Sequence, residues 1–109
     1  MQIAHRRLTT SSPLGDTEVS IRLFKPEESD GAWICRYEID WPGRKQSSFA
    51  AGIDSIQALL LALQRIGVDL YTSAYHETGS LKWFESTQGY GFPIAHNLRD
   101  LLIGDDVTL

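Results

Sequence analysis

The clearest pattern in the chain is an alternation of apolar and polar positions across residues 32–41. Charged side chains separate the later apolar ones in this segment. A period of two is typical of a β-strand with one buried face, and aromatic residues favour such a surface. The segment therefore predicts a strand whose buried face carries Trp33, Cys35, Tyr37, Ile39 and Trp41.

Two earlier segments predict strands that precede it. Residues 17–25 alternate in the same way, with a buried face that begins at Val19. Residues 2–10 alternate less regularly but predict the first strand. Between these segments, residues 11–16 are rich in Ser, Pro and Gly, which predicts a loop.

A fourth strand is predicted over residues 45–53, after a tight type II turn at Pro42-Gly43. Short connections favour antiparallel neighbours, because parallel strands need long crossovers. We therefore expect a four-stranded antiparallel meander. The fourth strand is expected to bury Phe49, Ala51 and Ile53.

The strongest helix signal follows this strand. Asp54 and Gln57 have the spacing of a capping box, with Asp in place of the usual Ser or Thr. Gly67 lies on the apolar stripe and would permit close approach to the sheet. A 3.6-residue period predicts that the helix buries Ile56, Leu59, Leu60, Leu63, Ile66, Gly67 and Leu70.

A second, smaller apolar stripe on the same helix is formed by Leu61 and Val68. Gln57 and Gln64 flank it. A helix exposed to water on that side would not need these apolar residues. The stripe therefore predicts contact with another layer or with a second subunit.

The end of the chain predicts two short elements. A strand is expected over residues 81–85, and a helix is expected to begin at Pro93, where a missing N–H is harmless. The sequence as a whole predicts a single α+β domain over residues 1–109, with the helices on one face of the sheet. The last helix would present Ile94, Leu98, Leu101 and Leu102 and end at Gly104.

Charge narrows the range of partners. The 109 residues include 10 Lys and Arg against 14 Asp and Glu, a formal charge of −4. This balance argues against nucleic acid as a partner. A basic patch would have to be local, at the adjacent pairs Arg6-Arg7 and Arg44-Lys45.

Catalytic and metal-binding patterns are weak. Cys35 is the only cysteine, so no internal disulfide can form, and its place among buried residues predicts an unreactive thiol. The histidines His5, His76 and His96 lack ligand spacing, so we expect no metal and no cofactor. We see no signal peptide and no apolar run of membrane-spanning length, which leads us to expect a cytoplasmic protein.

One group of residues predicts a binding cleft for a ligand or partner. Aromatic side chains and Arg are enriched at binding hot spots. The alternative is that the aromatic residues belong to the core and the others to the ordinary surface. The candidate residues are Tyr75, His76, Trp83, Tyr90, His96 and Arg99.

The chain also resembles a family of small uncharacterised bacterial proteins. The most specific part of the resemblance is the helix start G-x-D-S-x-Q-A-L, which spans residues 52–59. Residues 3–8, 33–39, 81–83 and 91–93 contribute to it. The resemblance implies a bacterial single-domain protein, and it implies no activity, cofactor or site residue.

These observations lead to two hypotheses about function. The first is a protein-interaction module that self-associates through the apolar stripe of Leu61 and Val68. The second is a small-ligand binder or enzyme that uses the aromatic, His and Arg cleft near the end of the long helix. No motif identifies a reaction, so the balance of the sequence favours the interaction module over an enzyme.

Overall fold

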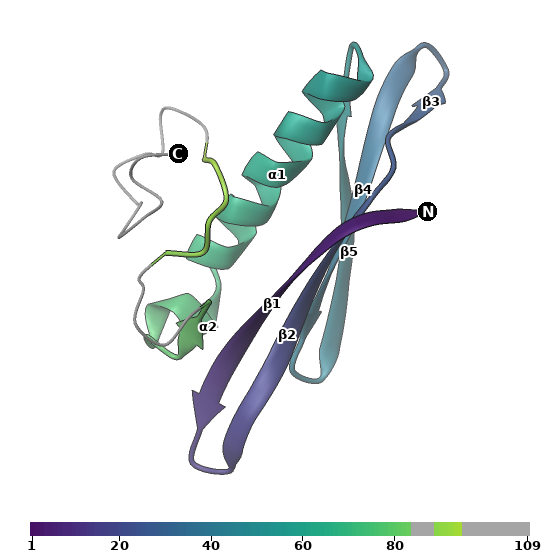
Figure 1. Cartoon of the computed structure of the whole chain (residues 1–109). Coiled ribbons are helices and arrows are strands. Elements are labelled where there is room, and N and C mark those ends of the chain that lie inside the picture. Colours follow the sequence, from purple (N-terminus) through teal and green to yellow (C-terminus); the bar gives the residue numbers. More distant parts are fainter. Residues whose placement is uncertain (84–88, 95–109) are drawn as a thin grey trace.

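The computed structural model describes residues 1–83 and 89–94 (Figure 1). These residues form a mostly antiparallel sheet with a long helix and a short helix, a mixed α+β architecture. The helices are α1 (Ser55–Tyr71) and α2 (Ala74–Glu77). The strands are β1 (Gln2–Ser12), β2 (Gly15–Phe24), β3 (Glu27–Ser29), β4 (Ala32–Trp41), β5 (Arg44–Gly52) and β6 (Leu81–Lys82).

The sheet contains six strands within the described residues, which exceeds the predicted four-stranded meander and separate short strand. The strand that was not predicted is β3. The predicted meander runs β1–β2–β4–β5, with antiparallel pairing throughout. β3 pairs with the start of β4 on the side that β2 occupies further along, and β6 pairs with β1. Pro26 separates β2 from β3, since proline cannot donate to a strand ladder.

The β1–β2 hairpin is longer than predicted. Ser12 pairs with Gly15, so only Pro13 and Leu14 form the loop that we predicted over residues 11–16. The hydroxyl of Ser12 donates to Gly15 O and accepts from Leu14 N, which stabilises this tight turn. Side-chain hydrogen bonding of this kind explains how a Ser- and Gly-rich stretch continues a strand.

The buried face of β4 is confirmed. Cys35, Tyr37, Ile39 and Trp41 are buried, and Trp33 packs against the core from its margin. The turn to β5 has Gly43 at φ +73°, as a type II turn requires at its second central position.

The predicted face of β5 was wrong. Ala50 is the buried apolar residue of this strand, whereas Ala51 is exposed, Phe49 is 47% exposed and Ile53 is 82% exposed. The face toward α1 also carries Gly52, where a Cβ atom would lie 2.5 Å from the backbone nitrogen of Ala58. Small residues face the helix because the two backbones lie too close for Phe.

The N-terminus of α1 confirms the predicted cap. The Asp54 carboxylate accepts a hydrogen bond of 2.8 Å from Gln57 N. The Gln57 side chain accepts in return from Ile53 N at 2.7 Å, one residue before the cap. Both bonds satisfy backbone donors that have no partner within the helix.

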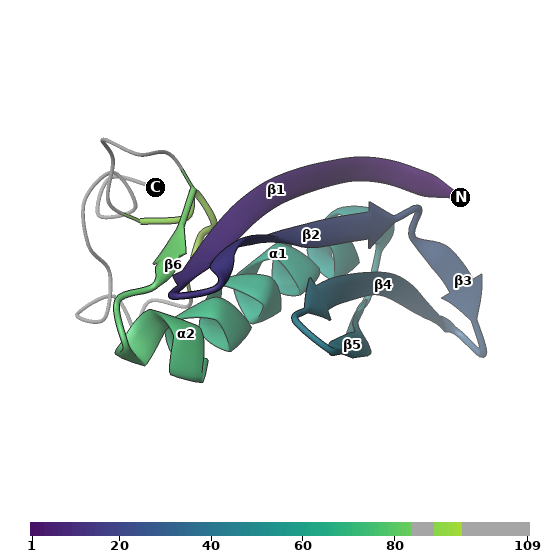
Figure 2. The same cartoon turned by 90° about the horizontal axis from the view of Figure 1, so that it is seen from below.

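The stripe of α1 has the predicted period but a different rotation. Ala58, Ala62, Ile66 and Leu70 are fully buried. Leu59 and Leu63 pack at the margin of the core, whereas Ile56 and Leu60 are 76% and 46% exposed. The small residue Ala58 faces β5, so the start of the helix lies close to this strand. Figures 1 and 2 show α1 on one face of the sheet.

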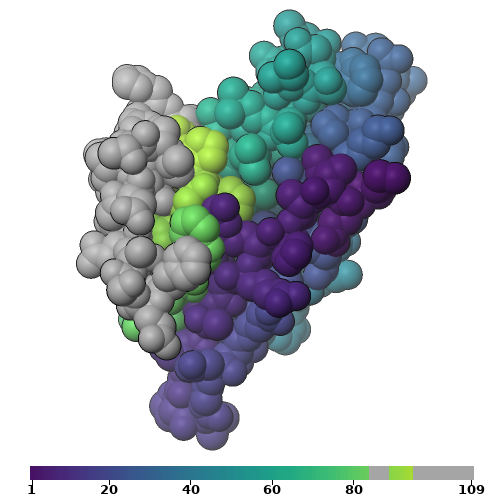
Figure 3. Space-filling model, in the orientation of Figure 1, coloured from purple at the N-terminus to yellow at the C-terminus, as the bar shows by residue number. Residues whose placement is uncertain are grey.

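Gly67 permits a close approach, although not to the sheet. A Cβ atom at this position would lie 2.9 Å from Pro93 O and 3.0 Å from the Ile94 side chain. Residues 89–94 therefore pack against the flank of α1, and Figure 3 shows part of this segment between α1 and β1. The prediction identified the right residue with the wrong neighbour.

The remaining C-terminal predictions fall partly outside the described residues. β6 spans only Leu81–Lys82 of the strand predicted over residues 81–85. The helix predicted from Pro93 to Gly104 lies almost entirely beyond the described residues. Across residues 1–83 and 89–94, no helix has the length and apolar character needed to span a bilayer.

Candidate functional site

An aromatic cluster forms where the two helices meet the C-terminal segment. The rings of Tyr71 and His76 lie 4.8 Å apart between centroids, and those of Tyr71 and Tyr90 lie 5.1 Å apart. His76 Nδ1 forms a hydrogen bond with the hydroxyl of Tyr90. The cluster thus joins the end of α1, the single turn of α2 and the segment 89–94.

The short helix α2 fixes the position of His76. The hydroxyl of Ser73, at the N-cap, accepts a hydrogen bond of 3.2 Å from His76 N. Burial lowers the pKa of His76, because a partly buried imidazolium loses hydration. A neutral ring bonded to a tyrosine hydroxyl is suited to joining structural elements.

Tyr75 occupies a different environment from its neighbour His76. Its ring stacks on Trp41 of β4, with centroids 5.2 Å apart and planes inclined by 10°. This contact anchors α2 to the turn end of β4. Consecutive helical residues point in different directions, which explains why Tyr75 and His76 contact different partners.

A second cluster is organised by Arg6 of β1. Its guanidinium lies 3.9 Å from the centre of the Trp83 ring and 4.9 Å from that of Phe92. The same group donates hydrogen bonds of 2.9 Å to Tyr90 O and 3.0 Å to Gly91 O. Arg6 therefore holds the C-terminal segment against β1.

The predicted cleft residues are thus divided. His76 contacts Tyr90, Trp83 stacks with Arg6, and Tyr75 stacks with Trp41. His96 and Arg99 lie outside the described residues. The sequence pattern did not indicate Arg6 as a member of this region. The alternation along β1 could have indicated Arg6, because it lies two residues from the buried Leu8 and therefore on the same face of the strand.

Leu61 and Val68 lie beside strand β5. Together with neighbouring residues of β5 and α1 they line a groove of about 310 Å³. Leu61 is partly buried and packs at the margin of the core. The other residues that line this groove are Ala50, Ala51, Gln64 and Arg65.

Strand β5 borders this groove and forms one edge of the sheet. Among the described residues it pairs with β4 alone, so its second edge is open. Arg65 Nη1 donates a 3.1 Å hydrogen bond to Phe49 O. An open strand edge presents backbone groups that can pair with another chain.

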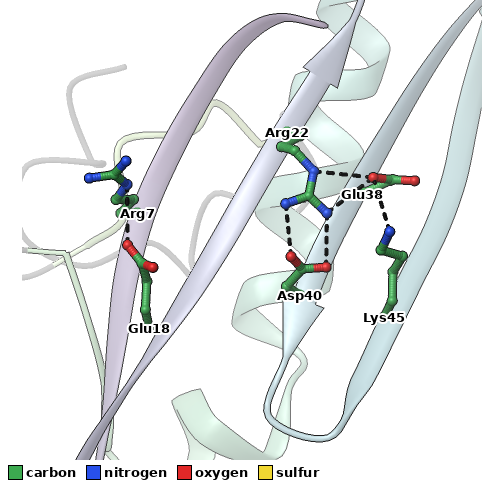
Figure 4. A network of polar contacts seen from close by, with 6 residues as sticks. All are labelled: Arg7, Glu18, Arg22, Glu38, Asp40 and Lys45. Atoms are coloured by element: carbon green, nitrogen blue, oxygen red, sulfur yellow. Dashed lines mark hydrogen bonds and ion pairs between the residues drawn. The ribbon is translucent and has the colours of Figure 1, made fainter.

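The outer face of the sheet carries a network of ion pairs (Figure 4). Arg22 binds Asp40 through both terminal nitrogens, at 2.8 and 2.9 Å, and also contacts Glu38. These bonds raise the pKa of Arg22 and lower the pKa of Asp40. Lys45 lies 3.7 Å from Glu38, and Arg7 pairs with Glu18 at 3.2 Å. Members of both basic pairs therefore already have acidic neighbours.

A polar network crosses the core between β4, β5 and α1. Asp69 accepts hydrogen bonds from the Tyr37 hydroxyl and, at 3.0 Å, from the Gln46 amide. The Gln46 oxygen in turn accepts from Trp41 Nε1 at 2.8 Å. Burial, followed by the bond to Asp69, raises the pKa of Tyr37 to about 12. Such a satisfied network fixes how α1 sits on the sheet.

The Cys35 thiol lies in the core of the domain. Cys35 is fully buried, and burial raises the pKa of its thiol, which disfavours the reactive thiolate. Within residues 1–83 and 89–94, no group of three or more His, Cys, Asp or Glu side chains could hold a metal ion.

Comparison with known proteins gives a family and no activity. No curated protein and no solved structure matches the chain. The family model described as "Domain of unknown function (DUF6968)" matches residues 4–94, which include β1, both helices and the segment held by Arg6. The chain therefore belongs to the family of the domain of unknown function DUF6968.

Proposed function

We propose that the protein is an interaction module that self-associates through the open edge of β5 and the adjoining Leu61–Val68 groove. The open edge is the observation that carries this proposal. Strand addition at such an edge gains backbone hydrogen bonds, and side-chain pockets beside it supply specificity. Leu61 and Val68 provide that apolar complement.

The composition of β5 suits a second copy as the partner. Its middle and end carry small or neutral residues, and its charged residues Arg44 and Lys45 lie together at the start. In an antiparallel pair centred on Ser48, Arg44 of one copy faces Gly52 of the other. The two Arg44 residues are then separated by roughly 26 Å at 3.3 Å per residue, where screening removes most repulsion.

This pairing has the symmetry expected of a homodimer. A two-fold axis through the centre of the β5 pair uses the same surface of each copy. Both α1 helices then lie on the same side of the extended sheet. Their Leu61 and Val68 side chains face each other across the new interface, and Phe49 contributes from the opposite face.

Light scattering coupled to size-exclusion chromatography tests the proposal. At high micromolar concentration we expect twice the 12.2 kDa monomer mass. Leu61→Asp should yield a folded monomer, because a charge cannot be buried in the groove without a partner. Leu60→Asp is the matched control, since Leu60 lies on another flank and is already 46% exposed.

Two results would contradict the proposal. One is a wild-type monomer at high micromolar concentration. The other is dissociation by Leu60→Asp that equals dissociation by Leu61→Asp, since this would show a general loss of packing rather than loss of this interface. Circular dichroism on each variant establishes that the chain remains folded.

A further inference from the structure

A groove lies at the opposite end of the domain from the start of α1. It occupies about 690 Å³, within the range of about 300–1,000 Å³ that is usual for small-molecule sites. The tip of the β1–β2 hairpin, Pro42 of the β4–β5 turn and the residues around α2 surround it. Figure 2 views the molecule from the side of this hairpin tip.

Seven of the ten described residues that line this groove carry a hydroxyl group. No described residue that lines it carries a charge at neutral pH. A hydroxyl both donates and accepts hydrogen bonds, so such a lining matches a ligand that presents hydroxyl groups itself. The hydroxyl-bearing residues include Thr10, Ser12, Thr17, Tyr75, Thr78 and Ser80.

Thr10 is an independent indication of a ligand. Thr10 is only 5% exposed, although it lines the groove. Within the described residues, no hydrogen bond joins its hydroxyl to another group. A buried hydroxyl without a partner costs about 1–3 kcal/mol. A ligand hydroxyl in the groove would remove this cost.

The wall that α2 and the segment after it form beside β1 is held by internal contacts. Tyr75 is held by its stack on Trp41. The Ser80 hydroxyl donates to Tyr75 O at 3.2 Å and lies 3.2 Å from the Thr78 hydroxyl. A fixed aromatic side chain beside fixed hydroxyls matches the alternating C–H and O–H surfaces of a sugar ring.

We infer that this groove binds a neutral saccharide. Thr10 and its cross-strand partner Thr17 supply hydroxyls from the sheet. Thr78 and Ser80, in the segment beside β1, supply acceptor oxygens, because both hydroxyls donate to Tyr75 O. The absence of charge among the described lining residues favours a neutral sugar over a sugar phosphate. This site shares no residue with the β5 edge or the Leu61–Val68 groove.

The experiment is a titration of the ¹⁵N-labelled protein, followed by NMR, with glucose, maltose, cellobiose and glucose 6-phosphate. We expect at least one neutral sugar to shift the amide signals of the groove residues, and glucose to bind better than glucose 6-phosphate. Thr10→Val preserves shape and should weaken binding by about three- to tenfold, the effect of one lost hydrogen bond.

Thr9→Val is the matched control, because Thr9 is the adjacent, exposed residue on the outer face of β1. It should leave binding unchanged. Thr17→Val provides a second test at an exposed position if Thr10→Val does not fold. The inference is overturned if no neutral sugar shifts the groove signals, if glucose 6-phosphate binds more tightly than glucose, or if Thr9→Val weakens binding as much as the groove variants.

Discussion

The two edges of the sheet differ in how far other described segments cover them. On the β1 side, β6 pairs with Thr9 and Thr10, and Arg6 holds the segment 89–94 in place. On the β5 side, the described residues provide one hydrogen bond from a side chain to the backbone of the strand, from Arg65 to Phe49 O. The comparison shows that a chain can close one edge with its own later residues and leave the other available.

The largest expected effect comes from breaking the closed side at Arg6. Arg6→Ala removes two charge-assisted hydrogen bonds and the contact with the Trp83 ring. We expect about 3 kcal/mol of lost unfolding free energy, because bonds to a charged group contribute about 1.5–3 kcal/mol each and are not additive. Urea denaturation followed by Trp fluorescence measures the loss.

Arg7→Ala is the control for that variant. Arg7 is the next residue of β1 and pairs with Glu18 on the exposed face. Its loss should change stability by less than about 1 kcal/mol, as is usual for surface ion pairs. Equal effects of the two substitutions would contradict the assignment of Arg6 as the residue that closes this edge.

A change of pH tests the same closed side through His76. Burial lowers the pKa of His76 from its ordinary 6.5 in the folded state. As the pH falls below 6.5, the unfolded chain takes up a proton that the folded chain resists, so stability decreases. The contribution of the neutral His76 ring to the unfolding free energy is fully present above pH 6.5, and it is lost as the pH approaches the folded-state pKa.

His76→Gln should flatten the part of the pH dependence that lies just below pH 6.5. His5→Gln should leave it unchanged, since His5 is exposed on β1. Thermal unfolding of the wild type and both variants across this range measures the difference. A wild-type profile that His76→Gln does not alter would show that the contact with Tyr90 is insensitive to protonation.

The smallest expected effect concerns the open edge. Arg65→Ala removes the hydrogen bond to Phe49 O, but this carbonyl is exposed and water can replace the donor. We expect a stability change within about 0.5 kcal/mol, typical of surface substitutions. Chemical denaturation of this variant measures it, and a loss as large as that of Arg6→Ala would remove the contrast between the edges.

Much of the fold followed from local pattern. The alternation around Tyr37 and the cap at Asp54 depend on neighbouring residues, and both are confirmed. The buried face of β5 could not be predicted in this way. Phe49 is more apolar than Ala50, so the pattern predicted that Phe49 would be buried, whereas the structure buries Ala50. Only the distance between α1 and the strand made the smaller residue the buried one.

The candidate sites were less accessible to prediction. The sequence singled out Leu61 and Val68 as unexplained by one buried stripe, and the structure places both beside β5. The candidate cleft residues contact different partners, because their side chains point in directions that sequence spacing does not predict. Tyr75 and His76 are adjacent in the chain, yet one stacks on β4 and the other bonds to Tyr90.

The sequence by itself determined the antiparallel α+β class, the period of each main element and the resemblance to its family. These properties arise from local propensity and from the periods of strands and helices. The tertiary structure alone decided which side of α1 meets the sheet, which neighbour Gly67 accommodates and how Arg6 closes one edge. Those outcomes depend on backbone distances between segments as much as 85 residues apart, and no local pattern encodes such distances.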